Sequence, residues 1–293
     1  MQANGETARP VHALSVDVED WFQVWALSGA IRRDQWDGFE LRVAASTGRL
    51  LDLFAERGAT ATFFCLGWVA ERCPDLIRRM AAEGHEVASH GYDHVKVMGQ
   101  DKAAFRADVI KTKAILEDLS GQPVRGYRAA GFSIDARTPW AHRLLAETGH
   151  AYSSSAHPIA HDHYGDPDAP MTPYVVDGLP ELPVSVREIR GRRTTIGGGG
   201  WFRAMPLPVT KHLWRGLEAE GRRGVFYLHP WEVDPGQPKV AGLSLKSRLR
   251  HRLNLRTTET KLAKMLDAFA WDRLDRVFAD EIAPRAASEA RAA

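Results

Sequence analysis

The chain has 293 residues, of which 44% are hydrophobic and 26% are charged, and its formal net charge is +2. This length allows one large α/β domain or two smaller ones, with a core that needs no disulfide or structural metal. The small net charge excludes a general attraction to nucleic acid. No signal-peptide pattern and no run of about 18 apolar residues occurs, so we expect a cytoplasmic protein.

Strand-like segments alternate with segments of helical period through the first half of the chain. The pattern predicts strands over 12–18, 59–67, 85–89, 124–130 and 150–155. It predicts helices over 41–58, 68–84, 101–121 and 136–149. All four of these helices end at a glycine, as expected of residues that need a positive φ: Gly58, Gly84, Gly121 and Gly149. Repeated βα units indicate a parallel sheet or barrel, with functional groups at the carboxyl ends of the strands.

The second half of the chain is less regular. Pro, Gly and Asp are frequent between about 156 and 205, which indicates loops or a small hairpin inserted in the barrel. Three further elements are then predicted, a helix over 208–224, a strand over 225–230 and a final helix near 257–269. We expect a single domain over 1–280, with a C-terminal extension from about 231, and a frayed tail over 281–293.

The stretch HEVASHGYDH at 85–94 raises the question of a metal site. It resembles the zincin pattern H-E-x-x-H, but His90 follows His85 by five positions, so on a helix the two would point to different sides. His90 and His94 are four apart, and a helical turn after the strand would bring both to one ion. A third ligand must come from elsewhere.

The first predicted strand ends in SVDVED, with Asp17, Glu19 and Asp20 close together. Alternation along a strand places Asp17 and Glu19 on one face and Asp20 in the following loop. Such carboxylates repel one another unless a cation neutralises them. A solvated acidic loop is the alternative interpretation. One carboxylate joined to His90 and His94 would form a site with open coordination positions, as a catalytic metal requires.

Two more predicted strand ends carry candidate residues. GYRAAGFSID contains Arg128, whose fixed charge could pair with a carboxylate base. YLHPWEVD contains His229 beside Pro230. A single histidine near an apolar strand is more often structural than catalytic. The coincidence of four such strand ends favours a functional interpretation.

The order SVDVED, SHGYDH, YRAAGFSI and YLHPWE resembles the polysaccharide deacetylase family of the NodB-homology type, carbohydrate esterase family 4. HPWEVDPGQP and GGGGWFR are similar to the branch found beside exosortase and exopolysaccharide gene clusters. The resemblance implies a distorted (β/α) barrel of about seven parallel strands. It also implies metal-dependent removal of acetyl groups from the N-acetylated sugars of an exopolysaccharide or its lipid-linked precursor, with Zn²⁺ or another divalent transition ion as cofactor.

The resemblance assigns roles by motif. It makes Asp17 the base, His90 and His94 the metal histidines, Arg128 the residue that orients the base, and His229 the general acid. The carboxylate ligand is Glu19 or Asp20, because Val18 interrupts the adjacent aspartates of most members, and strand alternation favours Glu19. Ala130 and Ser153 replace a proline and an aspartate of relatives, and both replacements fall in the expected pocket wall.

Four aromatic residues near the expected mouth could stack on sugar rings, with core packing as the alternative: Trp21, Trp201, Phe202 and Trp231. The predicted substrate-binding residues are Trp201, Trp231, Tyr127 and Phe132. The basic segment LKSRLRHRLNLR at 245–256 is either a solvated helical face or a peripheral contact with an anionic lipid-linked saccharide or the membrane surface.

Two rival functions remain at this point. An amidase acting on a small cyclic or linear amide would keep the metal and the barrel, since the same barrel branch is similar to allantoinase-like proteins. An inactive glycan-binding subunit is the other. The joint presence of Asp17, Arg128 and His229 argues against an inactive subunit, because a binder has no chemical use for base, orienting residue and acid together.

Overall fold

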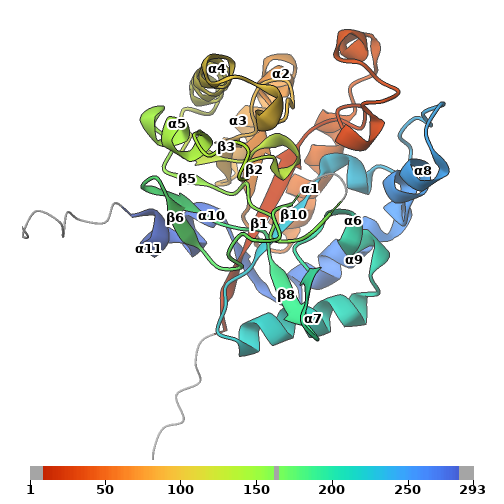
Figure 1. Cartoon of the computed structure of the whole chain (residues 1–293). Helices are drawn as coiled ribbons and strands as arrows, with labels where there is room; N and C mark the ends of the chain where they lie inside the picture. The colour runs from red at the N-terminus through yellow and green to blue at the C-terminus, as the bar shows by residue number, and fades with distance from the viewer. Residues whose placement is uncertain (1–8, 162–164, 284–293) are drawn as a thin grey trace, which may run out of the picture.

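The computed structural model describes residues 9–161 and 165–283. A curled sheet lies at its centre, and most of the helices cover the outside of that sheet (Figure 1). The strands follow the spatial order β10 (Val225–Leu228), β1 (Val11–Val18), β2 (Thr62–Cys65), β3 (Glu86–Ser89), β4 (Gly126–Tyr127), β5 (Tyr152–Ser153), β7 (Leu179–Glu181) and β6 (Tyr174–Val176). All neighbours in this order are parallel except β6 and β7. The predicted distorted (β/α) barrel is confirmed.

Strand β1 lies between β10 and β2 in the sheet. Every residue of this strand after Val11 is buried, as expected where helices or barrel interior cover both faces of a parallel strand. β10 pairs with it on one side, with Ser15 opposite Tyr227. β11 (Ala270–Asp272) pairs with its first residues. The last part of the chain therefore returns to the first strand.

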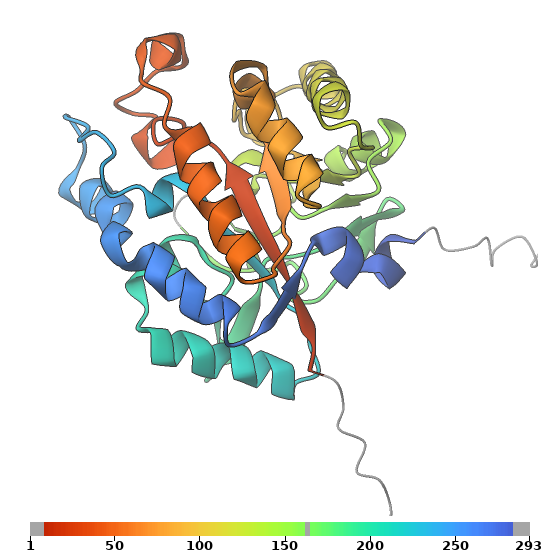
Figure 2. The same cartoon turned by 180° about the vertical axis from the view of Figure 1, so that it is seen from behind.

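The helices surround the sheet, and Figure 2 shows α1, α9 and α7 on the side seen from behind. An ion pair between Arg49 and Glu259 joins α1 to α9. The α-helices are α1 (Val43–Glu56), α2 (Gly67–Arg72), α3 (Pro74–Ala82), α4 (Lys102–Ser120), α5 (Ala141–Glu147), α6 (Gly199–Ala204), α7 (Leu207–Ala219), α8 (Leu245–Arg252), α9 (Leu255–Leu266), α10 (Leu274–Val277) and α11 (Ala279–Ile282). Short 3-10 turns are η1 (Trp25–Leu27), η2 (Arg33–Gly38), η3 (Val97–Gly99), η4 (Ala130–Phe132) and η5 (Pro230–Val233).

Most predicted elements are present, with one clear difference. The helix predicted over 68–84 is two helices, α2 and α3, which are divided at Cys73. Pro74 explains the break, because proline cannot donate the backbone hydrogen bond that would continue α2 but is well tolerated at the first position of α3. The four glycines expected at helix ends all have positive φ, with Gly58 at 59°, Gly84 at 84°, Gly121 at 65° and Gly149 at 82°.

The irregular region between 156 and 205 contains two hairpins in its described part, β6–β7 and β8 (Val186–Ile189) with β9 (Arg192–Thr195). Backbone from this region closes the barrel against β10, since the amide of Ser185 donates to Val225 O and that of Tyr227 donates to Gly197 O. Gly198, at φ 127°, lies so close to β10 that a Cβ there would be 1.8 Å from Tyr227 O. Only glycine fits this contact.

The segment after residue 231 packs back on the barrel through η5, α9 and β11. The predicted frayed tail begins too early, because Glu281 and Ile282 belong to α11 and Ile282 is buried. The rest of that prediction, over 284–293, lies outside the described residues. No helix in the described ranges has the length and apolar character needed to cross a bilayer.

Candidate active site

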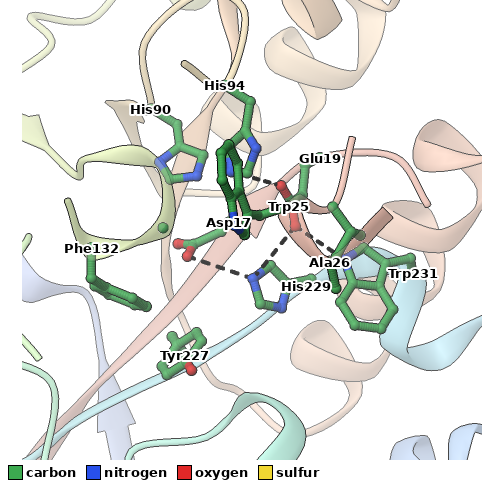
Figure 3. Close-up of a pocket in the computed structure, with 12 residues that line it drawn as sticks. Asp17, Glu19, Trp25, Ala26, His90, His94, Phe132, Tyr227, His229 and Trp231 are labelled. Carbon is green, nitrogen blue, oxygen red and sulfur yellow. Dashed lines mark hydrogen bonds and ion pairs between the residues drawn. The ribbon is translucent and has the colours of Figure 1, made fainter. Parts of the chain in front are cut away.

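The carboxyl ends of β1, β3 and β10 and the turn after β4 open into one pocket of about 600 Å³ (Figure 3). Its polar lining consists of Asp17, Glu19, His90, His94 and His229. Its walls are Val24, Trp25, Ala26, Gly131, Phe132, Tyr227 and Trp231. The prediction that Asp17 and Glu19, at the end of β1, meet the histidines of two distant motifs at strand ends agrees with this geometry.

Glu19, His90 and His94 form the one group of three or more ligand-type side chains found in the described part of the chain. One ligand atom of each lies within 4.8 Å of the others. Oε2 of Glu19 is buried and lies 2.9 Å from Nε2 of His94, yet it has no hydrogen bond of acceptable geometry among the described residues. A buried carboxylate oxygen in this position lacks the partner that a folded protein normally provides.

The donor set fits a divalent transition ion. Nδ1 of His90 lies 2.8 Å from the carbonyl oxygen of Arg128, so this nitrogen carries the proton and Nε2 keeps its lone pair. Two imidazoles and one carboxylate suit zinc and its neighbours in the first transition series, and they leave coordination positions for substrate. Glu19, His90 and His94 are the residues that would hold the ion.

Asp20 has a different position from the one expected of a ligand. Its carboxylate accepts hydrogen bonds from the backbone amides of Trp21, Arg42 and Val43, at 2.8, 2.7 and 2.9 Å. The last two amides belong to the N-terminus of α1, where unpaired N–H groups attract an acceptor. Asp20 therefore fixes α1 to the end of β1, and Glu19 is the carboxylate that faces the histidines.

The segment that carries the histidines is not helical. Residues 90–94 form a bent loop, in which Gly91 and His94 have φ values of 74° and 54°. The predicted helical turn is therefore wrong. The left-handed backbone of the loop instead places the ring centroids of His90 and His94 5.2 Å apart. His85 lies away from the pocket, where its Nδ1 accepts from the amide of Ala61.

Asp17 and Arg128 form a buried ion pair. Nη1 of Arg128 lies 2.7 Å from Oδ1 of Asp17, and both side chains are almost fully buried. The same guanidinium also donates to Ser15 Oγ and to the carbonyl and hydroxyl oxygens of Ser154. Four hydrogen bonds from its three nitrogens fix the guanidinium, so it holds the Asp17 carboxylate in one orientation.

His229 is the third charged centre of the pocket. Its Nε2 lies 3.9 Å from Oδ2 of Asp17 and 3.6 Å from Oε1 of Glu19 (Figure 3). Its Nδ1 lies 2.7 Å from Oε1 of Glu232, and Oε2 of that glutamate lies 2.5 Å from Nε of Arg203. Nε2 therefore points into the pocket while Nδ1 is tied to a carboxylate behind it.

Glu232 and Arg203 were missed at the level of sequence. Both are almost fully buried, and Arg203 also donates to the carbonyl oxygens of Arg250, His251 and Leu253. Glu232 was within reach of prediction, because a carboxylate three residues after His229 in HPWE can cap its own turn. Arg203 ends the motif GGGGWFR, but its role could not be predicted, because its partners are distant in sequence.

The pocket gives its titratable side chains different charges. Burial would raise the pKa of Glu19, but the neighbouring His94, together with His229 and His90, lowers it to about 2. Burial lowers the pKa of His90 to about 4. Burial would also lower the pKa of His229, but its hydrogen bond to Glu232 and the nearby carboxylates raise that pKa to about 9. The protein alone thus favours an ionised Glu19, a neutral His90 and a protonated His229.

The four aromatic residues predicted to bind substrate lie in different places. Phe132 and Trp231 line the pocket, and Nε1 of Trp231 donates to Oε1 of Glu19 at 3.1 Å. Trp201 is 43% exposed and lines an adjoining pocket of about 980 Å³, which shares Tyr227, His229 and Trp231 with the first. Tyr127 is 2% exposed and packs against Phe105 and His150 in the core, so its position does not support a substrate contact.

Two family models match adjacent parts of the chain. Residues 36–152 match the model described as polysaccharide deacetylase, and residues 154–279 match a domain of unknown function (DUF3473). Residues 36–152 therefore resemble a polysaccharide deacetylase domain. His90, His94 and Arg128 lie in the first matched segment and His229 in the second. Asp17 and Glu19 precede both segments, although β1 belongs to the same sheet as the strands of both.

Similar curated proteins are deacetylases of N-acetylated glycans. A peptidoglycan-N-acetylglucosamine deacetylase of Bacillus cereus is 33% identical over 96 residues, which is 32% of this chain and 35% of that protein. Chitooligosaccharide deacetylases of Rhizobium leguminosarum bv. trifolii and Sinorhizobium fredii are 38% identical over 96 residues and 52% identical over 112 residues. These matches cover 31% and 38% of this chain and 45% and 49% of those proteins, so the matched parts span less than half of each relative.

A solved structure supports the fold over nearly the whole chain. The crystal structure of a protein from Mycobacterium smegmatis, provisionally named a polysaccharide deacetylase, aligns with a TM-score of 0.63 at 21% identity. The alignment covers 93% of this chain and 90% of that one. Both family segments and β1 therefore belong to one shared fold.

Proposed function

We propose that the protein is a metal-dependent hydrolase that removes acetyl groups from N-acetylated sugars. The observation that carries this proposal is the arrangement of the pocket, in which Glu19, His90 and His94 face the Asp17–Arg128 pair and His229. The glycan deacetylases that match segments of the chain support the same reaction class.

An ion held by Glu19, His90 and His94 would supply a Lewis acid, which polarises the acetamide carbonyl and makes a water molecule easier to deprotonate. Zinc is the first choice for this ligand set, and cobalt, nickel or iron would also suit it.

Asp17 is the base of the proposed reaction. Its Oδ2 faces the pocket, while Oδ1 is held by Arg128. A carboxylate fixed in this way can accept the proton of the attacking water without turning away, and a positioned base contributes on the order of 10²- to 10⁴-fold to the rate.

His229 is the proposed acid. Breaking the C–N bond of an acetamide requires that the departing amine receive a proton, and Nε2 of His229 is the protonated group that points into the pocket. Glu232 holds Nδ1 from behind, so the ring presents the same nitrogen throughout the reaction. Base and acid are thus separate residues on neighbouring strands.

The proposed substrate is an exopolysaccharide or its lipid-linked precursor. Support comes from the resemblance of HPWEVDPGQP and GGGGWFR to proteins of exopolysaccharide loci, and from the second pocket, which extends the groove past Trp201. The proposal for Trp201 is that its half-exposed indole stacks on a sugar ring beside the acetamide site.

The test measures acetate release from N-acetylglucosamine oligomers by protein stripped of metal and then reloaded with zinc. We expect activity only in the reloaded protein and none in Asp17→Asn. His229→Ala should retain its metal and lose at least about a hundredfold in turnover on the oligomers. It should be much less impaired on aryl acetates, because a phenolate leaves without a proton.

The rival functions give different results. Release of ammonia or a carboxylate from ureides, with no acetate from acetylated oligosaccharides, would identify an amidase for small molecules. Binding of oligosaccharides without turnover in the zinc-loaded protein would identify a glycan-binding subunit. Equal losses of His229→Ala on amides and aryl acetates would show that His229 is not the acid.

A further inference from the structure

We infer that α8 is a docking surface for a bilayer that contains anionic phospholipid, and that it lies at the rim of the active-site groove. This inference goes beyond the proposed function, because it concerns binding and does not depend on the reaction.

The sequence around α8 has an unusual charge distribution. Between Asp234 and Glu259 there is no acidic residue, whereas there are six basic ones. These are Lys239, Lys246, Arg248, Arg250, Arg252 and Arg256. The chain as a whole has a net charge of only +2, so this positive charge is concentrated in one segment. Clustered Lys and Arg residues attract an anionic membrane surface at short range.

The helix exposes apolar side chains together with this charge. Leu245 is 81% and Leu249 is 67% exposed, and these are the two largest exposed fractions among the large hydrophobic residues found exposed in the described structure. Of the eight residues of α8, only His251 is buried. At roughly 100° per residue, an inward His251 places Leu249 on the opposite side, flanked by Leu245 and Lys246. Packing against its own protein does not explain this outer face.

Charge and leucines together favour a bilayer over a soluble polyanion. A polyanion would satisfy the cations but would leave both leucines in water. An interfacial helix instead places Leu side chains at the level of the acyl chains and Lys or Arg at the headgroups. A pocket of about 510 Å³ beside α8 repeats this combination, because it is lined by Lys239, Arg248 and Arg252 together with Val240 and Leu243.

The helix is held rigidly at the groove. Arg203 donates to the carbonyl oxygens of Arg250 and His251 at the end of α8, and the same guanidinium is paired with Glu232 behind the proposed acid. His251 stacks on Trp231 with ring centroids 4.6 Å apart. α8 also contacts η1, which contributes Trp25 to the pocket wall. In Figures 1 and 2 α8 lies at the edge of the molecule, away from the sheet.

A bilayer bound by α8 would therefore face the entrance of the groove. Glycans that are attached to a lipid at that surface would reach the pocket without leaving the membrane. The inference thus predicts which face of the protein is turned toward the lipid.

The test is co-sedimentation of the whole protein with vesicles of phosphatidylcholine alone or with about 30% phosphatidylglycerol, at low and high salt. We expect binding to the anionic vesicles only, and weaker binding at high salt. Lys246→Gln with Arg248→Gln should lower the partition coefficient on the order of fivefold per cation. Leu245→Ser with Leu249→Ser should lower it at least about tenfold, because two leucines leave the interface.

A matched control removes the same kinds of residue elsewhere. Ile110→Ser with Lys102→Gln changes an exposed apolar residue and a cation on α4, and it should bind like wild type. All variants should keep the wild-type melting temperature and the wild-type activity on soluble substrates, since none of these side chains lines the catalytic pocket.

Three results would overturn the inference. The first is equal binding of wild type to neutral and anionic vesicles, or to neither. The second is binding of the leucine variant as strong as that of wild type, with competition by a soluble polyanion such as heparin, which would identify a polyanion site. The third is a wild-type dimer that the leucine variant converts to monomer without a change in vesicle binding, which would identify a contact between copies of the chain.

Discussion

Nδ1 of His229 lies 2.7 Å from Oε1 of Glu232, and Glu232 is in turn bound by Arg203. Burial would raise the pKa of Glu232, but Arg203 and His229 lower it, so this glutamate is an anion behind the histidine. The arrangement fixes both the ring orientation and the charge of His229.

We predict that Glu232→Gln lowers turnover on N-acetylated oligosaccharides by about 10- to 100-fold. The carboxylate raises the pKa of His229, so its removal lowers that pKa. An acid acts only while it is protonated, and activity is lost as the pH rises through its pKa. The basic limb of the pH–rate profile should therefore move to lower pH.

Metal content and aryl acetate hydrolysis serve as controls for Glu232→Gln. Both should be close to wild type, because neither requires a protonated His229. A uniform loss on both substrates with an unchanged pH profile would contradict an effect on the acid and would indicate a structural defect instead.

Glu19→Ala and Asp20→Ala should differ in kind. Glu19 faces the histidines, so Glu19→Ala should lose the ion. Asp20 accepts from two backbone amides at the start of α1, so Asp20→Ala should keep the ion and lose about 1–2 kcal/mol of stability, as expected for loss of a helix cap. Elemental analysis and urea denaturation of both variants decide the point, and metal retained by Glu19→Ala would exclude it as a ligand.

Removal of Arg128 should leave Asp17 as an unpaired buried charge. We expect Arg128→Met to lose about 3–5 kcal/mol in the free energy of unfolding. The double variant Asp17→Asn with Arg128→Met should lose less than Arg128→Met alone, because no charge then remains buried. Denaturation of the three proteins tests this order, and a double variant less stable than Arg128→Met would contradict it.

Acid should destabilise the protein through buried histidines. Burial lowers the pKa of His12 and of His85 from 6.5 to about 4, and in each case Nδ1 accepts a backbone amide hydrogen, which requires a neutral ring. Between these values the unfolded chain binds more protons than the native state, so stability falls as the pH drops from about 6.5 to 4, by up to about 3 kcal/mol for each histidine.

His85→Asn tests this explanation, because an asparagine oxygen can accept the Ala61 amide but does not titrate. The variant should lose less stability than wild type over the same pH range, even if it is less stable at pH 7. An identical slope of unfolding free energy against pH in both proteins would assign the acid sensitivity to other groups.

The arrangement of strands was predictable because it follows from alternation and from glycine-ended helices. A parallel sheet gathers strand ends at one edge, and this rule is sufficient to bring Asp17, Glu19 and Arg128 together with the histidines. The same alternation argues against Tyr127 as a pocket residue, because the side chain of its neighbour Arg128 points into the barrel and adjacent residues of a strand point to opposite faces.

The remaining features depend on tertiary contacts that leave no local pattern. His94 adopts a left-handed φ that few non-glycine residues take, and so the helical turn was the more natural expectation. Arg203 finds its partners about 29 and 48 residues away, at Glu232 and His251. β11 is only three residues long and forms only because β1 is beside it.

The pairing of β1 with β10 has a consequence for biosynthesis. The strand that carries Asp17 and leads into Glu19 leaves the ribosome before its neighbour β10, which positions His229 and is made some two hundred residues later. Closing so long a loop is slow, and until β10 has been made the edge of β1 that pairs with β10 has no partner strand. The base and the acid are therefore brought together only after β10 has been made, and a nascent chain stopped before β10 would hold the ligand residues without the acid.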